Sequence, residues 1–286
     1  MLVSLQRRLI YKPECNSLLQ VALYPELLQY YPAARDVCIP TPDNESLGAW
    51  YLPFDNSQAV NSSRLIIFLH GNAGNRSGRL GWYKLFYEFG VSLLAIDYRG
   101  YGDSTGTPSE EGLARDAIAA WHFAKSLGYT DDSICLTGVS LGGAVAVRLA
   151  STLSSTGSTP AGLVLVATFA SMVETAAFHY PWVPVRWLLR DRFDSASFIK
   201  TIDTPILCFH GNTDDIVPIE MGKRLMSFAP DKSRTGIRPR FVEMKGVAHR
   251  RLAESGIEFY RRHLPVFLRQ IWNQQTPPEI KKERGS

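Results

Sequence analysis

Ser140 lies in a short run whose spacing is typical of a reactive serine. Residues 138–143 read Gly-Val-Ser-Leu-Gly-Gly, follow an apolar stretch at 133–137 and open a helical pattern. A Gly-x-Ser-x-Gly run between a strand and a helix forms a nucleophile elbow, a turn so sharp that the strand and the helix nearly touch. Such a turn holds the serine in a sparsely populated backbone conformation that costs about 1–3 kcal/mol. We therefore expect Gly138 and Gly142 to make room for the turn and Ser140 to be a nucleophile.

A serine hydroxyl is a poor nucleophile until a histidine removes its proton, and that histidine needs an acid to fix its tautomer. His249 lies in a loop just before the last helical pattern, and Asp214 and Asp215 follow an apolar run at 206–209. We expect one of these aspartates to orient His249 and the other to cap a turn or a helix. The order along the chain is then nucleophile, acid, base.

When a serine attacks a carbonyl, the carbonyl oxygen becomes negative and must be stabilised by hydrogen bonds from backbone N–H groups. Leu141 opens the helix after the elbow, where free N–H groups and the helix dipole favour negative charge. The glycine-rich loop at 70–76 predicts a second donor, the N–H of Asn72. Glycine-rich loops also cradle phosphate, but no Lys-Ser/Thr pair follows this one. A further turn at 97–104 is either only a tight loop or the floor beneath that donor loop, and its Ser104 has no elbow context.

Short apolar runs alternate with helical segments along most of the chain. Runs that are apolar on both faces predict strands of a central parallel sheet covered by helices, and so an α/β fold. The expected strands are residues 35–39, 47–53, 65–69, 91–96, 134–136, 163–167, 206–209 and 239–244, and the expected helices are residues 78–89, 109–127, 141–152, 219–228 and 250–272.

An insertion at about 168–204 is expected to form a small cap. Its aromatic side chains either line a pocket for an apolar substrate or pack the cap onto the sheet. The candidate substrate-contacting residues are Tyr98, Phe169, His179, Trp182 and Trp187.

Composition places the chain among ordinary globular proteins. Of 286 residues, 45% are hydrophobic and 20% are charged, and the net charge of +4 is too small to indicate nucleic-acid binding. No run approaches the roughly 18 apolar residues of a spanning helix, and no signal-peptide pattern opens the chain. We expect a cytoplasmic protein, with peripheral membrane contact left open and the oligomeric state undetermined. The expected organisation is an extension at 1–35 packed on or near the core, one domain at 36–272, and a disordered tail at 273–286.

Cysteine and metal patterns predict neither disulfides nor a metal site. Cys38, Cys135 and Cys208 fall within expected strands and are expected to be reduced, buried thiols. Neither a His-Glu-x-x-His nor a Cys-x-x-Cys spacing occurs. We expect no metal and no cofactor.

With these residues in place, residues 36–272 resemble the α/β-hydrolase superfamily, in its small serine-hydrolase branch of carboxylesterase-, lysophospholipase- and depalmitoylase-like enzymes. The motifs are His-Gly-Asn-Ala-Gly-Asn at 70–75, Asp-Tyr-Arg-Gly-Tyr-Gly-x-Ser at 97–104, Gly-x-Ser-x-Gly-Gly at 138–143, and His-Gly-x-x-Asp-x-x-Val-Pro at 210–218. The resemblance implies a mostly parallel central sheet flanked by helices, with a short helical cap. It also implies that Asp214, rather than Asp215, completes the triad.

The resemblance implies hydrolysis of a carboxylic ester through an acyl-enzyme on Ser140. The alternatives are a thioester or lysophospholipid with a long acyl chain, acyl transfer to an alcohol, and a binding protein that has kept the fold without catalysis. Dehalogenases and epoxide hydrolases of this fold carry aspartate at the elbow, so Ser140 argues against both. The amino-terminal anchor helix and the cysteine cluster of the membrane-linked members are not found in this sequence.

Overall fold

A central sheet of eight strands organises the protein. The computed structural model describes residues 2–54 and 63–272, with side chains from residue 6 onward. Along the sheet the strand order is β10-β9-β8-β7-β4-β6-β3-β2. β2 pairs antiparallel with β3, and β3 antiparallel with β6, whereas all other pairs are parallel. The strands are β2 Arg35–Pro40, β3 Ser46–Leu52, β4 Leu65–Leu69, β6 Ser92–Ile96, β7 Ile134–Val139, β8 Gly162–Val166, β9 Ile206–Gly211 and β10 Arg240–Met244.

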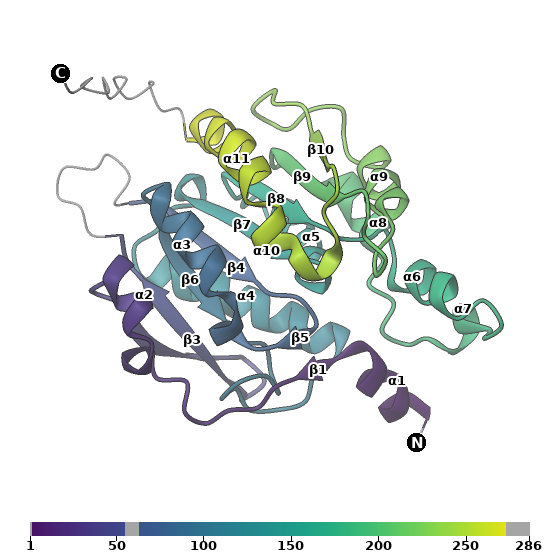
Figure 1. The fold of residues 1–286 in the computed structure, drawn as a ribbon, viewed down its shortest axis with the longest axis horizontal. Helices are drawn as coiled ribbons and strands as arrows, with labels where there is room; N and C mark the ends of the chain where they lie inside the picture. The colour runs from purple at the N-terminus through teal and green to yellow at the C-terminus, as the bar shows by residue number, and fades with distance from the viewer. Residues whose placement is uncertain (1, 55–62, 273–286) are drawn as a thin grey trace.

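Helices cover both faces of the sheet because its central strands are apolar on both faces. In β4, Ile67 packs into one hydrophobic cluster and its neighbours Ile66 and Phe68 into the other. The first cluster draws on α4 and α5, and the second on α3 and α11, which lie on the opposite side of the sheet (Figure 1). These helices are α3 Leu80–Glu88, α4 Glu110–Ser126, α5 Leu141–Ser155 and α11 Ile257–Ile271, with α9 Ile219–Ser227 beside β9.

The helix expected at 250–272 is interrupted. A 3-10 turn at His249–Arg251 leads into α10 Leu252–Ser255, and α11 starts after Gly256. A side chain at Gly256 would place its Cβ 2.4 Å from the carbonyl oxygen of Leu252 and 2.8 Å from the Tyr260 ring. Glycine lets the chain turn closely against both groups at this break.

The amino-terminal segment runs along the sheet and the loops at its edge. It contains α1 Leu2–Ile10, the short strand β1 Lys12–Pro13, a 3-10 turn at Val21–Leu23 and α2 Pro25–Tyr30. β1 pairs in parallel with β5 Ala73–Gly74, inside the glycine-rich loop. Ile10 and Tyr11 belong to one hydrophobic cluster, and Tyr31 to the other. The tail expected at 273–286 lies outside the described residues.

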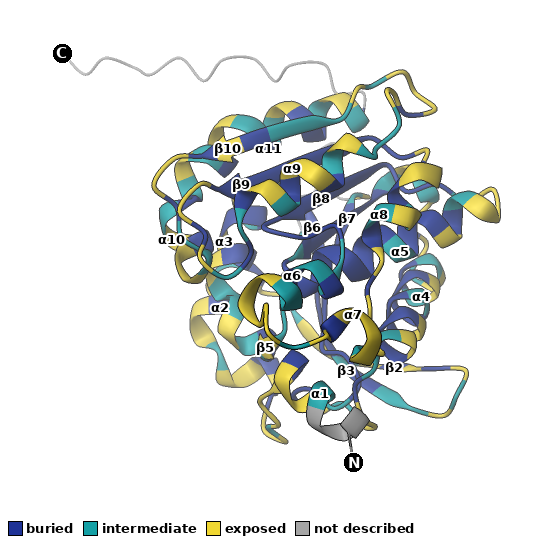
Figure 2. Ribbon diagram, turned by 90° about the vertical axis from the view of Figure 1, so that its right-hand side faces the viewer, coloured by how far each residue is buried: buried dark blue, intermediate teal, exposed yellow. Residues whose placement is uncertain are grey.

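The insertion between β8 and β9 forms the expected short helical elements. They are α6 Met172–His179, α7 Val185–Leu188 and α8 Ser195–Phe198. Figure 2 shows α6 and α7 on the same face as α1, with many exposed residues. Among residues 2–54 and 63–272, no helix is long and apolar enough to cross a membrane.

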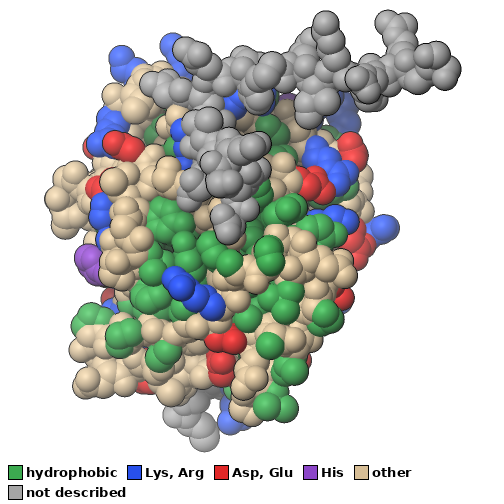
Figure 3. Space-filling model, turned by 90° about the vertical axis from the view of Figure 1, so that its left-hand side faces the viewer, with side chains coloured by type: hydrophobic (Ala, Val, Ile, Leu, Met, Phe, Trp, Pro, Cys, Tyr) green, Lys and Arg blue, Asp and Glu red, His purple; other side chains and the backbone are tan. Residues whose placement is uncertain are grey.

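A different face carries an apolar patch over α2 and α3 (Figure 3). The Tyr87 ring lies 5.4 Å from the rings of both Tyr30 and Phe54, measured between centroids. Lys84 Nζ lies 5.6 Å from the centroid of Tyr30, so a cation covers part of this patch.

One cysteine prediction is wrong. Cys135 and Cys208 are buried free thiols, and burial raises the pKa of Cys208 to about 12. Cys38 is exposed, although it lies in a strand as expected. β2 is at the edge of the sheet and presents one face to solvent, which an apolar run in the sequence does not reveal.

Candidate active site

Ser140 occupies the strained turn that its motif predicts. It lies between the end of β7 and the start of α5, with φ 53° and ψ −116°. Positive φ is uncommon for a residue with a side chain and persists only when its surroundings enforce it. Here the Ser140 N–H donates to the carbonyl of Val166 at 2.8 Å, and the Ser140 carbonyl accepts from Thr168 Oγ1 at 2.9 Å. The neighbouring strand and its following loop therefore hold both sides of the serine.

The two flanking glycines allow the close approach of strand and helix. A Cβ at Gly138 would lie 2.3 Å from the carbonyl oxygen of Gly142. A Cβ at Gly142 would lie 2.0 Å from the carbonyl oxygen of Leu69 in β4. Both obstacles are backbone atoms, which cannot move aside as a flexible side chain can. Only glycine fits at either position.

Asp214 and His249 contact each other, as expected from their places after β9 and β10. Asp214 Oδ2 lies 2.7 Å from His249 Nδ1, and the carboxylate is fully buried. The other oxygen, Oδ1, accepts the backbone N–H groups of Ile216 at 3.0 Å and Val217 at 2.7 Å. With Nδ1 donating to Asp214, a neutral His249 keeps Nε2 unprotonated and able to accept a proton.

The two aspartates do not divide their tasks as the sequence suggested. Asp214 alone both caps the turn and orients His249, because its two carboxylate oxygens face different donors. Asp215 is exposed and makes no contact with His249 among the interactions of the described residues.

His210 is a neighbour of this pair that sequence reasoning did not single out. Its ring is fully buried, with Nε2 2.7 Å from the carbonyl oxygen of Val217 and 3.6 Å from Asp214 Oδ2. Burial lowers the pKa of His210 below its ordinary value of 6.5. A neutral ring that donates Nε2–H to Val217 fixes the turn from which Asp214 projects. The signal was present, since His210 opens the His-Gly-x-x-Asp motif.

Asn72 is held by the amino-terminal segment. Its carbonyl oxygen accepts from the N–H of Lys12 and from Tyr101 Oη, both at 2.9 Å, and its side-chain Nδ2 donates to the carbonyl of Ile10 at 2.9 Å. The backbone N–H of Asn72 donates to no group among the described residues. Leu141 is the first residue of α5, so its N–H lacks an intrahelical acceptor.

His70 orients the peptide that carries the Asn72 N–H. Its Nδ1 lies 2.7 Å from the carbonyl oxygen of Gly71. Since the described peptide bonds are all trans, the Asn72 N–H points the opposite way from that carbonyl and away from the His70 ring. His70 Nε2 lies 3.1 Å from Asp97 Oδ1.

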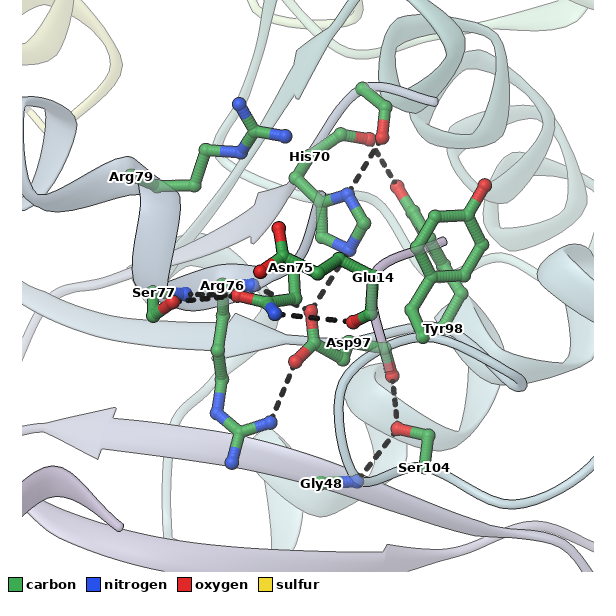
Figure 4. A network of polar contacts seen from close by, with 12 residues as sticks. Glu14, Gly48, His70, Asn75, Arg76, Ser77, Arg79, Asp97, Tyr98 and Ser104 are labelled. Atoms are coloured by element: carbon green, nitrogen blue, oxygen red, sulfur yellow. Dashed lines mark hydrogen bonds and ion pairs between the residues drawn. The ribbon is translucent and has the colours of Figure 1, made fainter. Parts of the chain in front are cut away.

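A buried network supports the loop from below (Figure 4). Asp97, at the end of β6, accepts the N–H of Arg76 at 2.7 Å and Arg76 Nη1 at 2.6 Å. Arg76, itself 1% exposed, also forms a two-point contact with Asp103. Ser104 Oγ donates to the carbonyl of Asp97 and accepts from the N–H of Gly48. The turn at 97–104 is therefore the floor of the loop, and Ser104 is part of that floor.

A cavity of about 620 Å³ opens beside Ser140 and His249. Its wall comes from the loop around Asn72, the start of α3, and the segment at 249–254. Lys12, Arg79 and Arg250 are among its lining residues, with Glu254 as an acidic member. The cavity floor thus holds the serine and the histidine, and its wall carries more basic than acidic side chains.

None of the five expected substrate-contacting residues lines this cavity. Tyr98 is fully buried and donates to the carbonyl of His70 at 3.0 Å, so it supports the loop. Phe169 is buried in the core, and Trp182 and Trp187 are exposed on the cap. His179 Nε2 lies 2.7 Å from the carbonyl oxygen of Ile216, a residue that lines the cavity. The wall is built instead by the amino-terminal segment, the first loops and the segment at 249–254, so substrate contact by the five residues stays a prediction.

Metal-binding geometry is absent from residues 2–54 and 63–272: no group of three or more His, Cys, Asp or Glu side chains is placed to hold an ion.

The fold and the site together define a class of protein, an α/β scaffold with a strained serine at a sharp turn from a strand into a helix. The sequence matches the α/β hydrolase family over residues 66–275. An uncharacterised protein of Mycobacterium tuberculosis is 39% identical over 247 residues, covering 86% of this chain and 81% of its own length. The lysophosphatidylserine lipase ABHD12 of Macaca fascicularis is 31% identical over 247 residues, covering 80% of this chain and 59% of the lipase.

Solved structures show the same fold at lower sequence identity. The Pyrococcus furiosus esterase Pf2001 superposes with a TM-score of 0.69 at 19% identity, covering 91% of this chain and 98% of the esterase. Est1E of Butyrivibrio proteoclasticus, with ferulic acid bound, superposes with a TM-score of 0.64 at 19% identity, covering 83% of this chain and all of that one.

The chain belongs to the α/β hydrolase family, and the expected mostly parallel fold is confirmed. The protein is a hydrolase of this family, and its relatives include a lipase. The matched part of the chain covers less than two thirds of that lipase's length.

Proposed function

We propose that the protein is a serine hydrolase that cleaves carboxylic esters through an acyl-enzyme on Ser140. The observation that carries the proposal is the buried contact of Asp214 with His249 Nδ1, beside the cavity that also holds the strained serine. A strained nucleophile, a base and an acid that fixes the base's tautomer are the parts that serine acyl transfer requires.

The first half of the reaction forms the acyl-enzyme. Ser140 Oγ attacks the ester carbonyl carbon while its proton passes to His249 Nε2, and the carbonyl oxygen becomes negative. The N–H groups of Asn72 and Leu141 are proposed to donate to that oxygen, an interaction worth on the order of 3 kcal/mol per donor. The carbon–oxygen bond to the alcohol then breaks, and the alcohol leaves with the proton from His249.

The second half restores the enzyme. Water attacks the acyl carbon as His249 accepts its proton, and the same two N–H groups meet the second oxyanion. The bond to Ser140 Oγ then breaks, the serine takes back its proton from His249, and the carboxylic acid is released. Asp214 keeps its charge throughout and stabilises the imidazolium.

A fluorophosphonate probe and a short-chain p-nitrophenyl ester test this proposal. The wild type should react covalently with the probe and hydrolyse the ester, whereas Ser140→Ala should do neither. Ser126→Ala, at an exposed serine at the end of α4, is the matched serine control and should still be labelled. A wild type that resists the probe would refute the catalytic proposal and favour a binding protein on the same fold. Added alcohols separate hydrolysis from acyl transfer, because a transferase would yield new esters.

A second candidate substrate is a lysophospholipid, or another long-chain acyl ester or thioester. The basic side chains of Lys12, Arg79 and Arg250 in the cavity wall favour an anionic leaving group. The relative at 31% identity is named a lysophosphatidylserine lipase. A panel of acyl esters and thioesters of increasing chain length, with lysophosphatidylserine and lysophosphatidylcholine, tests this substrate. Rates that fall for all acyl groups longer than acetyl would exclude the lipid version while leaving esterase activity intact.

A further inference from the structure

The cap carries large apolar side chains that the protein does not bury. Trp187 is 90% exposed, Trp182 is 78% exposed and Phe178 is 56% exposed. The chain has six tryptophans, and the other four, Trp50, Trp82, Trp121 and Trp272, are buried. Two tryptophans left in solvent within six residues of each other mark an unusual surface.

The helix α1 extends this surface. Gln6 Nε2 donates to the carbonyl of Leu188 at 2.7 Å, and Arg7 Nε contacts Asp191 Oδ2 at 3.0 Å. Tyr11 Oη also donates to Asp191, at 2.9 Å. These contacts join α1 to the end of α7, and both helices lie on the face seen in Figure 2. We call the joined surface the cap face; its exposed members are Arg8, Leu9, Phe178, Tyr180, Trp182, Arg186, Trp187, Leu188 and Arg190.

The charge of the cap face is positive. Arg8, Arg186 and Arg190 are exposed there. From residue 172 to residue 193 the only acidic side chains are Glu174, which contacts Arg224 at 3.3 Å, and Asp191, which is paired with Arg7. Both acids are thus neutralised within the molecule. Arg8, Arg186 and Arg190 form no ion pair with any residue that the structure describes.

The cap face lies next to the candidate active site. His179, at the end of α6, contacts the carbonyl oxygen of Ile216 at 2.7 Å. Ile216 lines the cavity beside Ser140, and its backbone N–H donates to Asp214. A surface bound by the cap face would therefore lie beside the cavity.

We propose that the cap face docks onto an anionic phospholipid bilayer. Tryptophan prefers the boundary between lipid headgroups and acyl chains, and arginine stems extend along apolar surface while their guanidinium groups reach phosphate or carboxylate. Anionic lipids attract basic clusters at a membrane surface. A second copy of the chain is a poorer occupant, because a symmetric pair would bring two positively charged copies of the cap face together.

Co-sedimentation with vesicles tests the docking. The wild type should sediment with vesicles of phosphatidylcholine mixed with phosphatidylserine, and much less with phosphatidylcholine alone. Raised salt should weaken the binding, because the charges lie within reach of screening ions. Binding should also shift the tryptophan emission to shorter wavelength, as Trp182 and Trp187 leave water.

Two double variants separate the apolar and the charged contributions. Trp182→Ser with Trp187→Ser should lower vesicle affinity on the order of tenfold or more. Arg186→Glu with Arg190→Glu should remove the preference for phosphatidylserine. The matched controls are Leu23→Ser, an exposed apolar residue elsewhere, and Lys232→Glu with Arg238→Glu, exposed basic residues outside the cap face. These controls should bind like the wild type, and thermal unfolding of every variant checks that it is folded.

Three results would overturn the docking. They are no sedimentation with either vesicle, equal binding by the cap-face variants and the wild type, or a dimer that dissociates in the double tryptophan variant without any vesicle binding. Ser140→Ala should bind vesicles like the wild type, since docking does not involve the serine. The outcome is therefore independent of whether the proposed ester chemistry is correct.

Discussion

Replacing Asp214 by asparagine should abolish most of the proposed ester hydrolysis while leaving the protein folded. In the native site, Asp214 Oδ2 accepts from His249 Nδ1 at 2.7 Å, and Oδ1 accepts the N–H groups of Ile216 and Val217. An asparagine oriented by those two N–H groups keeps its oxygen at the Oδ1 position and turns its NH₂ toward His249. Nδ1 must then become an acceptor, so the proton of a neutral ring moves to Nε2, the nitrogen needed as a base.

The size of the effect follows from that tautomer change. A base held in the wrong tautomer costs on the order of 10⁴-fold in kcat, or about 5.4 kcal/mol of transition-state stabilisation. The folded state loses less, because the two N–H groups exchange a charged acceptor for a neutral one, which costs about 1–3 kcal/mol in all. Asp214→Ala should destabilise more, since it leaves both N–H groups without a partner.

Steady-state hydrolysis of a p-nitrophenyl ester measures the loss in kcat, and urea unfolding of the same samples measures the loss in stability. Asp215→Asn is the matched control, because Asp215 is the exposed neighbour and should retain activity within about threefold. If Asp214→Asn kept more than about a tenth of the wild-type kcat, the assignment of Asp214 as the orienting acid would be wrong. A large loss in Asp215→Asn instead would transfer the role to that residue.

Other parts of the site give predictions of their own. Arg76→Ala should lower the free energy of unfolding by about 3–5 kcal/mol, because it removes the arginine side chain that pairs with the buried Asp97 carboxylate; urea denaturation measures this, and a loss below about 1 kcal/mol would contradict it. Gly142→Ala should prevent formation of the elbow, since its Cβ would lie 2.0 Å from the Leu69 carbonyl, and fluorophosphonate labelling at the wild-type rate would disprove this. Burial holds the pKa of His210 below the ordinary 6.5, so the folded state binds fewer protons than the unfolded chain. Stability should therefore fall as pH drops below about 6.5, and unfolding curves of His210→Gln should show a shallower dependence on pH there.

The sheet and the elbow could be predicted because their causes are local. A strand buried on both faces is mostly apolar along its length. β4 is apolar at every position, and β6, β8 and β9 each contain a run of four apolar residues. The elbow motif specifies both its glycines and its place between a strand and a helix. The break at Gly256 was missed because one glycine in a helical pattern does not reveal that the Tyr260 ring packs against it.

The wall of the cavity could not be predicted because it depends on contacts between distant segments. The Lys12 N–H donates to Asn72 where β1 and β5, each two residues long, pair with each other. So short a pairing leaves no recognisable pattern in the sequence. The aromatic cap residues had the right composition for a pocket, but composition does not determine which way Trp182 and Trp187 face. Their exposure is a property of how α6 and α7 pack, which the sequence alone left open.

Because the exposed cap tryptophans do not line the cavity, the proposed catalysis and the proposed membrane docking depend on different elements of the fold. The proposed catalytic groups stand at the carboxyl ends of buried strands, where the sheet fixes their positions through contacts such as Val166 with Ser140. The cap face contacts the rest of the protein through pairs such as Glu174 with Arg224 and His179 with Ile216. Substitutions on the cap face can therefore change which surfaces the protein binds without disturbing the strained serine. Ile216, which contacts His179 at the end of α6, lines the same cavity as Ser140. A substrate that enters from a bilayer bound to the cap face would therefore reach the serine through this one cavity.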